Sequence, residues 1–131
     1  MLALADFQIG AFTVALEPDE ILTGLLVPKL SGKARWGYYK ICRKPGEFAD
    51  SIGAVVFDAE RDYCRVVLGA TDGSPLQVPA LAERIASTGK GDVEIDDAKQ
   101  ALADQGAVFD DYGTQIHAVA LSRAIKGAFA S

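Results

Sequence analysis

The chain contains few of the residues that most often carry enzyme chemistry. It has two cysteines, Cys42 and Cys64, and one histidine, His117, with no CxxC pair. Two cysteines cannot form a disulfide framework, and a zinc site needs several Cys or His ligands at defined spacings. The sequence therefore predicts no disulfide scaffold, no metal site and no Cys/His catalytic pair. A reducing cytoplasm is the expected compartment.

Basic side chains and long apolar runs are also scarce. The 131 residues include 13 Lys or Arg and 18 Asp or Glu, giving a net charge of -5. Nucleic acids and anionic membranes bind basic surfaces, so neither is an expected partner. The longest apolar run, residues 21–30, is interrupted and far shorter than the ~20 residues of a membrane span. The first residues lack the basic start of a signal peptide.

Apolar residues make up half of the sequence, and charged residues make up 24%. This balance excludes a disordered chain, which would be poorer in apolar residues and more strongly charged. A chain of this length can bury roughly two-thirds of its unfolded surface and fits one domain. We therefore expect a single domain over residues 1–131.

Strand patterns come first along the chain, and helix patterns follow. Alternating or β-rich runs predict strands at residues 7–16, 21–27, 36–43, 54–57 and 63–68. Helical spacing predicts a helix beginning at Pro79, a second over residues 95–103 and a third over residues 111–129. Strands followed by helices indicate an α+β fold. We expect an antiparallel β-sheet of three to five strands, followed by a small three-helix bundle packed on it.

Most of the chemistry-bearing residues have a structural explanation. His117 has no nearby nucleophile or second histidine, so it is expected to be a partly buried structural residue. Cys42 and Cys64 lie in β-type runs and are expected to be packed thiols. The acidic pairs at 96–97 and 110–111 stand at helix starts, where negative charge is favourable. A hydrolase based on these pairs would need one of them to share a pocket with His117.

A basic cluster at the end of the third predicted strand is harder to assign. Lys40, Arg43 and Lys44 place three of the 13 basic residues within five positions, beside Tyr38 and Tyr39. As the solvated end of a strand, the cluster needs no function. As a site, it would offer cationic donors and aromatic surface to an anionic or electron-rich ligand. The residues alone leave both interpretations open.

Four segments, in order, resemble one known family. Residues 6–23, DFQIGAFTVALEPDEILT, are similar to the DFFxGxYTTALxPDEILT stretch of the FAD-carrying subunit of molybdenum hydroxylases. Residues 38–49, YYKICRKPGEFA, resemble its YxKxxRRxxDFA motif. Residues 68–76, LGATDGSPL, resemble LGGxxxxPxR, and residues 117–125, HAVALSRAI, resemble its terminal helix. Together they span nearly the whole chain and indicate the carbon monoxide dehydrogenase and xanthine dehydrogenase family.

The resemblance covers only the C-terminal domain of such a subunit. The family's nucleotide-binding half, with glycine-rich loops around the FAD diphosphate, precedes this region, and we expect it to be absent here. In the family, electrons from a molybdenum centre pass through iron–sulfur clusters to FAD and then to an acceptor. The resemblance therefore implies FAD as the cofactor, with the molybdenum cofactor and 2Fe-2S clusters on partner subunits.

Four residues are implied as flavin contacts. Asp6 and Phe12 belong to the first motif, whose aromatic end lies near the isoalloxazine ring in the family; many members have Tyr at the position of Phe12. Leu22 matches an apolar residue that borders the flavin, and Lys40 matches a lysine close to the ring. A cation there would stabilise negative charge on the reduced ring. No catalytic residue is implied.

The implied role is to close one side of the FAD site and to pack against partner subunits, without catalysis by this chain alone. The alternative is a non-catalytic protein-interaction module that keeps the fold but binds no flavin. Convergence of Phe12, Leu22 and Lys40 on one open face would favour the flavin role. An apolar patch left where the missing half belonged would drive self-association, so a homo-oligomer is a further expectation.

Overall fold

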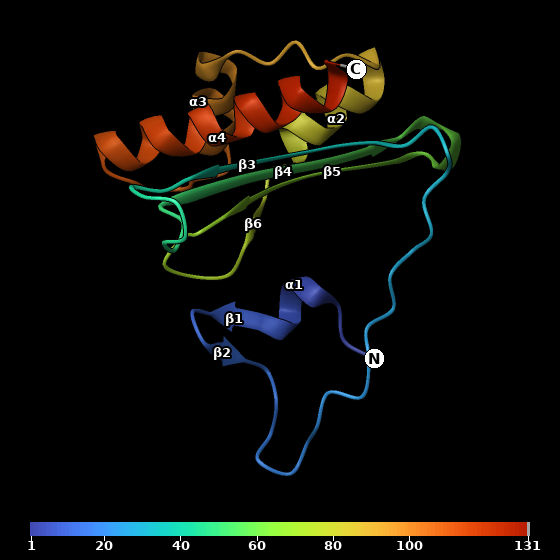
Figure 1. The fold of residues 1–131 in the computed structure, drawn as a ribbon, viewed down its shortest axis with the longest axis vertical. Helices are drawn as coiled ribbons and strands as arrows, with labels where there is room; N and C mark the ends of the chain where they lie inside the picture. Colours follow the sequence, from blue (N-terminus) through green and yellow to red (C-terminus); the bar gives the residue numbers. More distant parts are fainter. Residues whose placement is uncertain (131) are drawn as a thin grey trace.

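A four-stranded antiparallel sheet forms the body of the chain, and three helices cover one of its faces (Figure 1). The structure is a computed structural model and describes residues 1–130. Each strand pairs with the next in chain order: β3 (Arg35–Ile41), β4 (Ser51–Asp58), β5 (Tyr63–Gly69) and β6 (Leu76–Gln77). A short 3-10 helix, η1 (Ala59–Arg61), connects β4 to β5. Strands β3 and β6 are therefore the two edges of the sheet.

The three helices are α2 (Pro79–Thr88), α3 (Ile95–Asp104) and α4 (Asp111–Phe129). Their ends are set by local sequence. Pro79 occupies the first turn of α2, where an N–H would have no helical partner. Gly89 ends α2 in the left-handed conformation, with φ at 66°. Asp110 begins α4 by accepting a hydrogen bond from the Gly113 N–H. None of the described helices has the length and apolar character needed to cross a membrane.

Helix α4 packs directly on β3 and β4 because two glycines let it approach. A Cβ added at Gly37 would lie 2.0 Å from the carbonyl oxygen of Ala124, and one at Gly53 would lie 2.3 Å from that of Ala120. Both distances are far below van der Waals contact, so only glycine fits at this helix–sheet contact. The largest fully buried apolar side chains of the core are Val55, Val66, Leu68, Val78, Ile85, Val93, Leu102, Leu121 and Ile125.

The opposite face of the sheet is not covered by α2, α3 or α4 (Figure 1). Side chains alternate along a strand, so β3 directs Trp36, Tyr38 and Lys40 to this side. Strand register places Val56 beside Trp36 and Ile52 beside Lys40. We call this surface, which runs from β3 across β4 to β5, the open face. Trp36 is 71% exposed there, so the open face presents large aromatic side chains to solvent.

The first 30 residues form an arm on the open-face side of the sheet (Figure 1). The arm contains α1 (Leu4–Phe7), β1 (Gln8–Gly10) and β2 (Thr13–Val14), and the two strands pair as an antiparallel ribbon. None of the arm's residues is buried. The arm therefore contributes nothing to the core of the body.

The predicted α+β fold is confirmed, but two predicted strands are wrong. Residues 7–16 form a short hairpin that turns at residues 11–12, so they do not form one strand. Residues 21–27 form no strand although they are rich in β-formers. A strand needs a neighbour to pair with, and this segment has none in the described chain. The two-residue β6 is too short to give a periodic sequence signal.

Candidate functional site

An open hollow surrounds Lys40 on the open face. Its volume is about 360 Å³, and its lining consists of Tyr38, Lys40, Gly46, Glu47, Phe48, Ala49 and Ile52. Strand β3 supplies the first two of these residues, β4 supplies the last, and the loop between the strands supplies the rest. That loop turns back because the Glu47 N–H donates to the Lys44 carbonyl, with Gly46 in a left-handed conformation (φ 90°).

The hollow combines one cation with aromatic and aliphatic surface. The Lys40 Nζ donates to the Glu47 carbonyl oxygen at 2.6 Å. An ammonium has three donors, so others remain for a ligand. In the part of the chain that the structure describes, no carboxylate lies within ion-pair distance of Lys40. Phe48 is 91% exposed beside it. This chemistry suits a flat ligand that carries hydrogen-bond acceptors along one edge.

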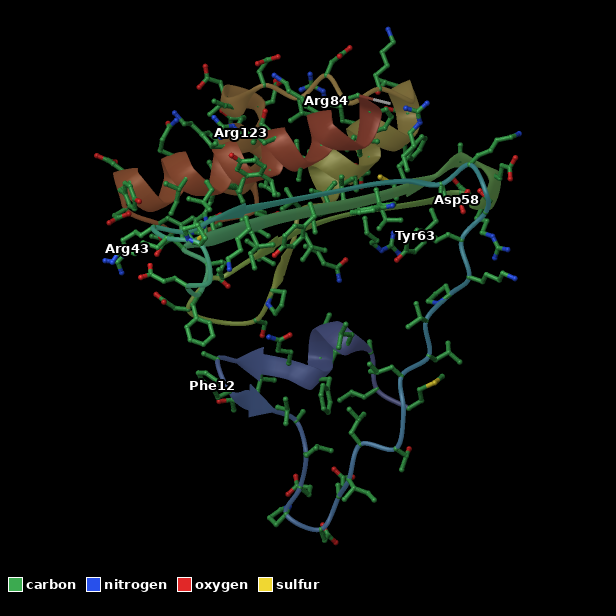
Figure 2. All side chains as sticks on the ribbon, viewed as in Figure 1. Phe12, Arg43, Asp58, Tyr63, Arg84 and Arg123 are labelled. Carbon is green, nitrogen blue, oxygen red and sulfur yellow. The ribbon has the colours of Figure 1, made fainter. Side chains whose placement is uncertain are left out.

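The basic cluster of the sequence does not form one site. Of its three cations, only Lys40 lines the hollow. Arg43 and Lys44 are exposed in the loop that follows β3, and Arg43 lies at the end of the sheet (Figure 2). The neighbouring Tyr39 faces the helices, where its hydroxyl accepts a hydrogen bond from Arg123. The ligand-binding interpretation therefore concerns Lys40 and Tyr38.

The other three predicted flavin contacts lie on the arm. Asp6 is in α1, Phe12 is in the turn between β1 and β2, and Leu22 is in the irregular segment that follows. All three are exposed, and Phe12 lies on the open-face side of the sheet, the side of Lys40 (Figure 2). No hydrogen bond or ion pair within residues 1–130 joins any of them to Lys40. The chain places these residues on one side of the sheet but does not close them into one pocket.

Phe12 combines full exposure with an unfavourable backbone conformation. Its φ is 54°, in the left-handed region, and its side chain is 100% exposed. This conformation costs roughly 1–2 kcal/mol for a residue that carries a Cβ. The ring gains no burial within this chain that would offset the cost. Such outliers favour a role in binding, because contacts with another molecule can supply the missing stabilisation.

His117 and the acidic pairs have structural roles, as predicted. His117 is 5% exposed, its Nδ1 lies 2.8 Å from the Ser51 hydroxyl oxygen, and burial lowers its pKa. Asp97 forms a capping box with Glu94 at the start of α3, and Asp110 caps α4. Ser51 is fully buried, so a substrate has no access to its hydroxyl. The hydrolase interpretation gains no support from this geometry.

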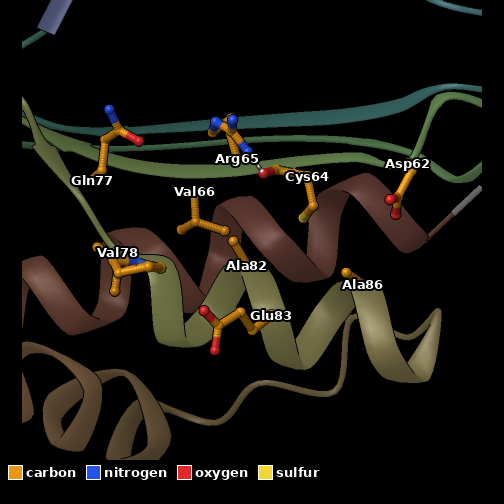
Figure 3. A pocket seen from close by; sticks show the side chains of 10 residues that line it. Asp62, Cys64, Arg65, Val66, Gln77, Val78, Ala82, Glu83 and Ala86 are labelled. Atoms are coloured by element: carbon orange, nitrogen blue, oxygen red, sulfur yellow. Dashed lines mark hydrogen bonds between the residues drawn. The ribbon is translucent and has the colours of Figure 1, made fainter.

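A second hollow, of about 220 Å³, lies between β5 and α2 (Figure 3). Cys64 contributes to its lining together with apolar residues that include Val66 and Ala82. Burial raises the pKa of the Cys64 thiol, so the reactive thiolate is disfavoured. Cys64 is a buried thiol, as predicted, and Cys42 is half-buried. We assign no chemistry to this hollow.

Sequence reasoning missed Glu47, Phe48 and Ile52 as neighbours of Lys40. Ile52 reaches the hollow through the register of β3 and β4, which no local pattern specifies. The two loop residues reach it because the chain turns back after Lys44. The dipeptide Pro45-Gly46 predicts that turn, so it is the one signal that could have placed the loop beside Lys40.

The chain is similar in sequence to subunits of known oxidoreductases. The medium chain of carbon monoxide dehydrogenase from Afipia carboxidovorans is 28% identical over 145 residues, an alignment that covers 98% of this chain and 48% of the relative. The chain is a homologue of the carbon monoxide dehydrogenase medium chain. Caffeine dehydrogenase subunit beta from Pseudomonas sp. (strain CBB1) is 31% identical over 81 residues, covering 60% of this chain and 28% of that subunit. The resemblance to this oxidoreductase family is confirmed.

Solved structures of such enzymes share the fold. The match to reconstituted CO dehydrogenase from Oligotropha carboxidovorans covers 95% of this chain and 46% of the matched enzyme chain, with a TM-score of 0.73 and 25% sequence identity. The match to quinoline 2-oxidoreductase from Pseudomonas putida 86 covers 95% of this chain and 46% of the matched enzyme chain, with a TM-score of 0.67. Its sequence identity is 22%, so this match supports the fold alone. No protein-family model matches the chain. The chain spans less than half of the length of the curated relatives it matches.

Proposed function

We propose that the chain is part of the FAD-containing subunit of a molybdenum hydroxylase-type oxidoreductase, where it closes one side of the flavin site. The observation that carries this proposal is the Lys40 hollow on the open face of a homologue of the carbon monoxide dehydrogenase medium chain. Lys40 belongs to the YYKICRKPGEFA segment that resembles the family motif.

The hollow fits the ring system of a flavin. Tyr38, Phe48 and Ile52 offer flat or apolar surface, and Lys40 offers a positive charge with free donors. An isoalloxazine ring is flat and carries carbonyl and ring-nitrogen acceptors along one edge. The exposed ring of Phe12 on the arm can cover the cofactor from a second direction. Asp6 and Leu22 remain predicted contacts from the same arm.

The roles of the chain's own residues follow from their chemistry. FAD, when bound, accepts electrons and passes them to an acceptor. Lys40 binds the acceptor edge of the ring and stabilises negative charge that develops there. A flat ring that covers the apolar side chains around Lys40 would exclude water there and thereby strengthen that interaction. The chain supplies no acid, base or nucleophile in this role, so it is not catalytic alone.

FAD binding requires a second structural unit in this proposal. Glycine-rich loops for the diphosphate belong to the family's nucleotide-binding half, and the relatives are about twice as long as this chain. The partners are therefore that half and the subunits that hold the 2Fe-2S clusters and the molybdenum cofactor. A cytoplasmic location and self-association through exposed apolar surface are part of the same proposal.

A flavin titration with and without a nucleotide-binding half tests the proposal. The chain is purified alone and co-expressed with the remaining portion of a carbon monoxide dehydrogenase medium chain, and each sample is titrated with FAD. We expect flavin absorbance to co-purify only with the mixture. Association of the two parts without flavin, or failure of the two parts to associate, would contradict the proposal and favour the non-catalytic interaction module.

A further inference from the structure

Strand β3 is a sheet edge whose outer side is open in the described chain. It contains seven residues and pairs with β4 alone. Apart from that pairing, residues 36–40 make no backbone hydrogen bond with any other part of residues 1–130. An edge of this kind presents a row of unpaired N–H and C=O groups that can hydrogen-bond to another polypeptide. The strand is about as long as an average strand, so it offers a complete edge.

The charge around this edge is opposite to that of the chain as a whole. Residues 36–50, which include most of β3 and the loop after it, contain three basic residues, Lys40, Arg43 and Lys44, and two acidic residues, Glu47 and Asp50, whereas the whole chain has a net charge of -5. Lys40 lies on the open-face side of β3, and Arg123 lies on the helix side, where its guanidinium is 5.0 Å from the centre of the Tyr39 ring. Arg43 and Lys44 follow the end of the strand. Within residues 1–130, no carboxylate is within ion-pair distance of these four cations.

We propose that the outer edge of β3 binds an acidic, extended segment of a partner protein, which adds to the sheet as a further strand. Main-chain hydrogen bonds provide affinity in this mode of recognition, and side chains provide specificity. Side chains of the added strand alternate between the two faces of the sheet. Those on the helix side meet Arg123, and those on the open face meet Trp36 and Tyr38. The edge therefore selects acidic residues on the helix side and β-branched or aromatic residues on the open face.

Charge and backbone chemistry exclude other occupants of this edge. A second copy would bring its own basic β3 against this one, and like charges on paired strands destabilise the pairing. A nucleic acid or an anionic membrane has no row of alternating N–H and C=O groups to match a strand edge. The inference is independent of flavin binding, since it concerns the edge of the sheet and not the Lys40 hollow.

A designed peptide provides the direct test. The probe is a fluorescein-labelled peptide of about eight alternating Glu and Thr residues, a length that matches β3. Matched peptides replace Glu with Gln or with Lys. Binding to the full chain is followed by fluorescence polarisation at low salt, and hydrogen exchange of the β3 amides is measured with and without the peptide. We expect saturable binding of the Glu peptide only, and about tenfold slower exchange at the outward-facing β3 amides, because these amides become hydrogen-bonded.

Charge-reversal variants locate the binding surface. Arg43→Glu and Arg123→Glu are each expected to weaken peptide binding by about tenfold, because each replaces an attraction with a repulsion. Lys90→Glu is the matched control: it makes the same charge change at an exposed loop position between α2 and α3, outside β3 and the loop that follows it. We expect an effect below about twofold for this control, because separated surface charges are largely screened. Circular dichroism of each variant confirms that the fold is retained.

Several outcomes would overturn the inference. Equal weakening by Lys90→Glu and Arg43→Glu would show that only net charge matters. Binding of the Glu peptide without slower exchange in β3 would show that no strand is added. If the chain bound no peptide, the proposed strand addition would be wrong. If it bound vesicles that contain phosphatidylserine but not the peptide, the basic side chains would have a membrane-binding role.

Discussion

The buried carboxylate of Asp58 holds Ser31 through two hydrogen bonds. The Ser31 N–H donates to Oδ2 and the Ser31 hydroxyl donates to Oδ1, each at 2.7 Å. Asp58 is the last residue of β4 and lies at the end of the sheet that the arm reaches (Figure 2), and Ser31 directly follows the 30 residues of the arm. The pair therefore fixes where the arm leaves the sheet. It constrains the direction in which the arm, with Phe12 and Leu22, extends from the body.

Asp58→Ala is expected to loosen this junction and to change the pH dependence of stability. The hydrogen bond from the Ser31 N–H, together with its hydroxyl and Arg61, lowers the pKa of Asp58. A lowered carboxyl pKa stabilises the folded chain above the unfolded pKa, and the stabilisation is lost as the pH falls through the lowered value. Near neutral pH, the thermal unfolding midpoint of the variant should be lower than that of the unmodified chain. Below about pH 4, the midpoint of the variant should fall less steeply with pH than that of the unmodified chain. Hydrogen exchange of the Ser31 amide should be faster.

Glu60→Ala is the control for the Asp58 variant. Glu60 pairs with Lys33 at 2.8 Å, but both side chains are largely exposed, and exposed ion pairs contribute little to stability. Its unfolding midpoint should stay close to that of the unmodified chain. If the unfolding midpoint fell equally in both variants, the Asp58–Ser31 contact would contribute no more to stability than an exposed ion pair.

Gly53→Ala is expected to destabilise the chain by about 1–3 kcal/mol or more. The added Cβ would meet the backbone carbonyl of Ala120, and backbone cannot move aside as a flexible side chain does. Gly127→Ala provides a control of opposite sign. Gly127 lies in α4 with nothing within 4 Å of an added Cβ, so alanine should stabilise the helix by up to about 1 kcal/mol. Urea unfolding of both variants measures the difference, and similar behaviour of the two would contradict the close packing of α4.

His117 is expected to make stability fall as the pH is lowered through the mildly acidic range. Burial lowers its pKa below the ordinary value of 6.5, so the unfolded chain binds a proton before the folded chain does. Stability is then complete above about pH 7 and decreases below about pH 6.5. His117 is the only histidine of the chain, so the slope of the unfolding free energy between about pH 7 and pH 5 should be smaller in His117→Gln. An unchanged slope would assign the titration to another group.

Ser51→Ala is expected to cost about 1–3 kcal/mol, since it leaves the buried Nδ1 of His117 without its hydrogen-bond partner. Urea unfolding at about pH 8, where the histidine is neutral, measures this loss without interference from protonation. A variant as stable as the unmodified chain would indicate that another group replaces the Ser51 hydroxyl.

Lys40→Met and Phe12→Gly separate flavin binding from folding. Methionine keeps the aliphatic stem of Lys40 but removes its charge, and we expect FAD affinity in the assembled mixture to fall by about tenfold. Glycine at position 12 relieves the left-handed strain while removing the exposed ring, so FAD affinity should fall without loss of stability. Lys44→Met is the charge-matched control, since Lys44 does not line the hollow. Unchanged FAD affinity in Lys40→Met would remove that residue from the site.

The sequence by itself determined the helices and the central strands. Pro79 and Gly89 delimit α2, Asp97 completes the capping box at the start of α3, and Asp110 caps α4, because caps act through neighbours a few residues away in the chain. Apolar and polar alternation likewise places Tyr38 and Lys40 on one side of β3. These features depend on local chemistry, so local patterns predict them.

Only the tertiary structure decided what those elements form together. The β-rich segment 21–27 has no neighbouring strand and stays irregular, and Phe12 turns the chain where alternation predicts a strand. The Lys40 hollow depends on the register that brings Ile52 alongside and on the loop that returns Phe48. Ser51 and Asp58 acquire their partners His117 and Ser31 from 66 and 27 residues away. Such contacts follow from packing of the whole chain, which local sequence does not encode.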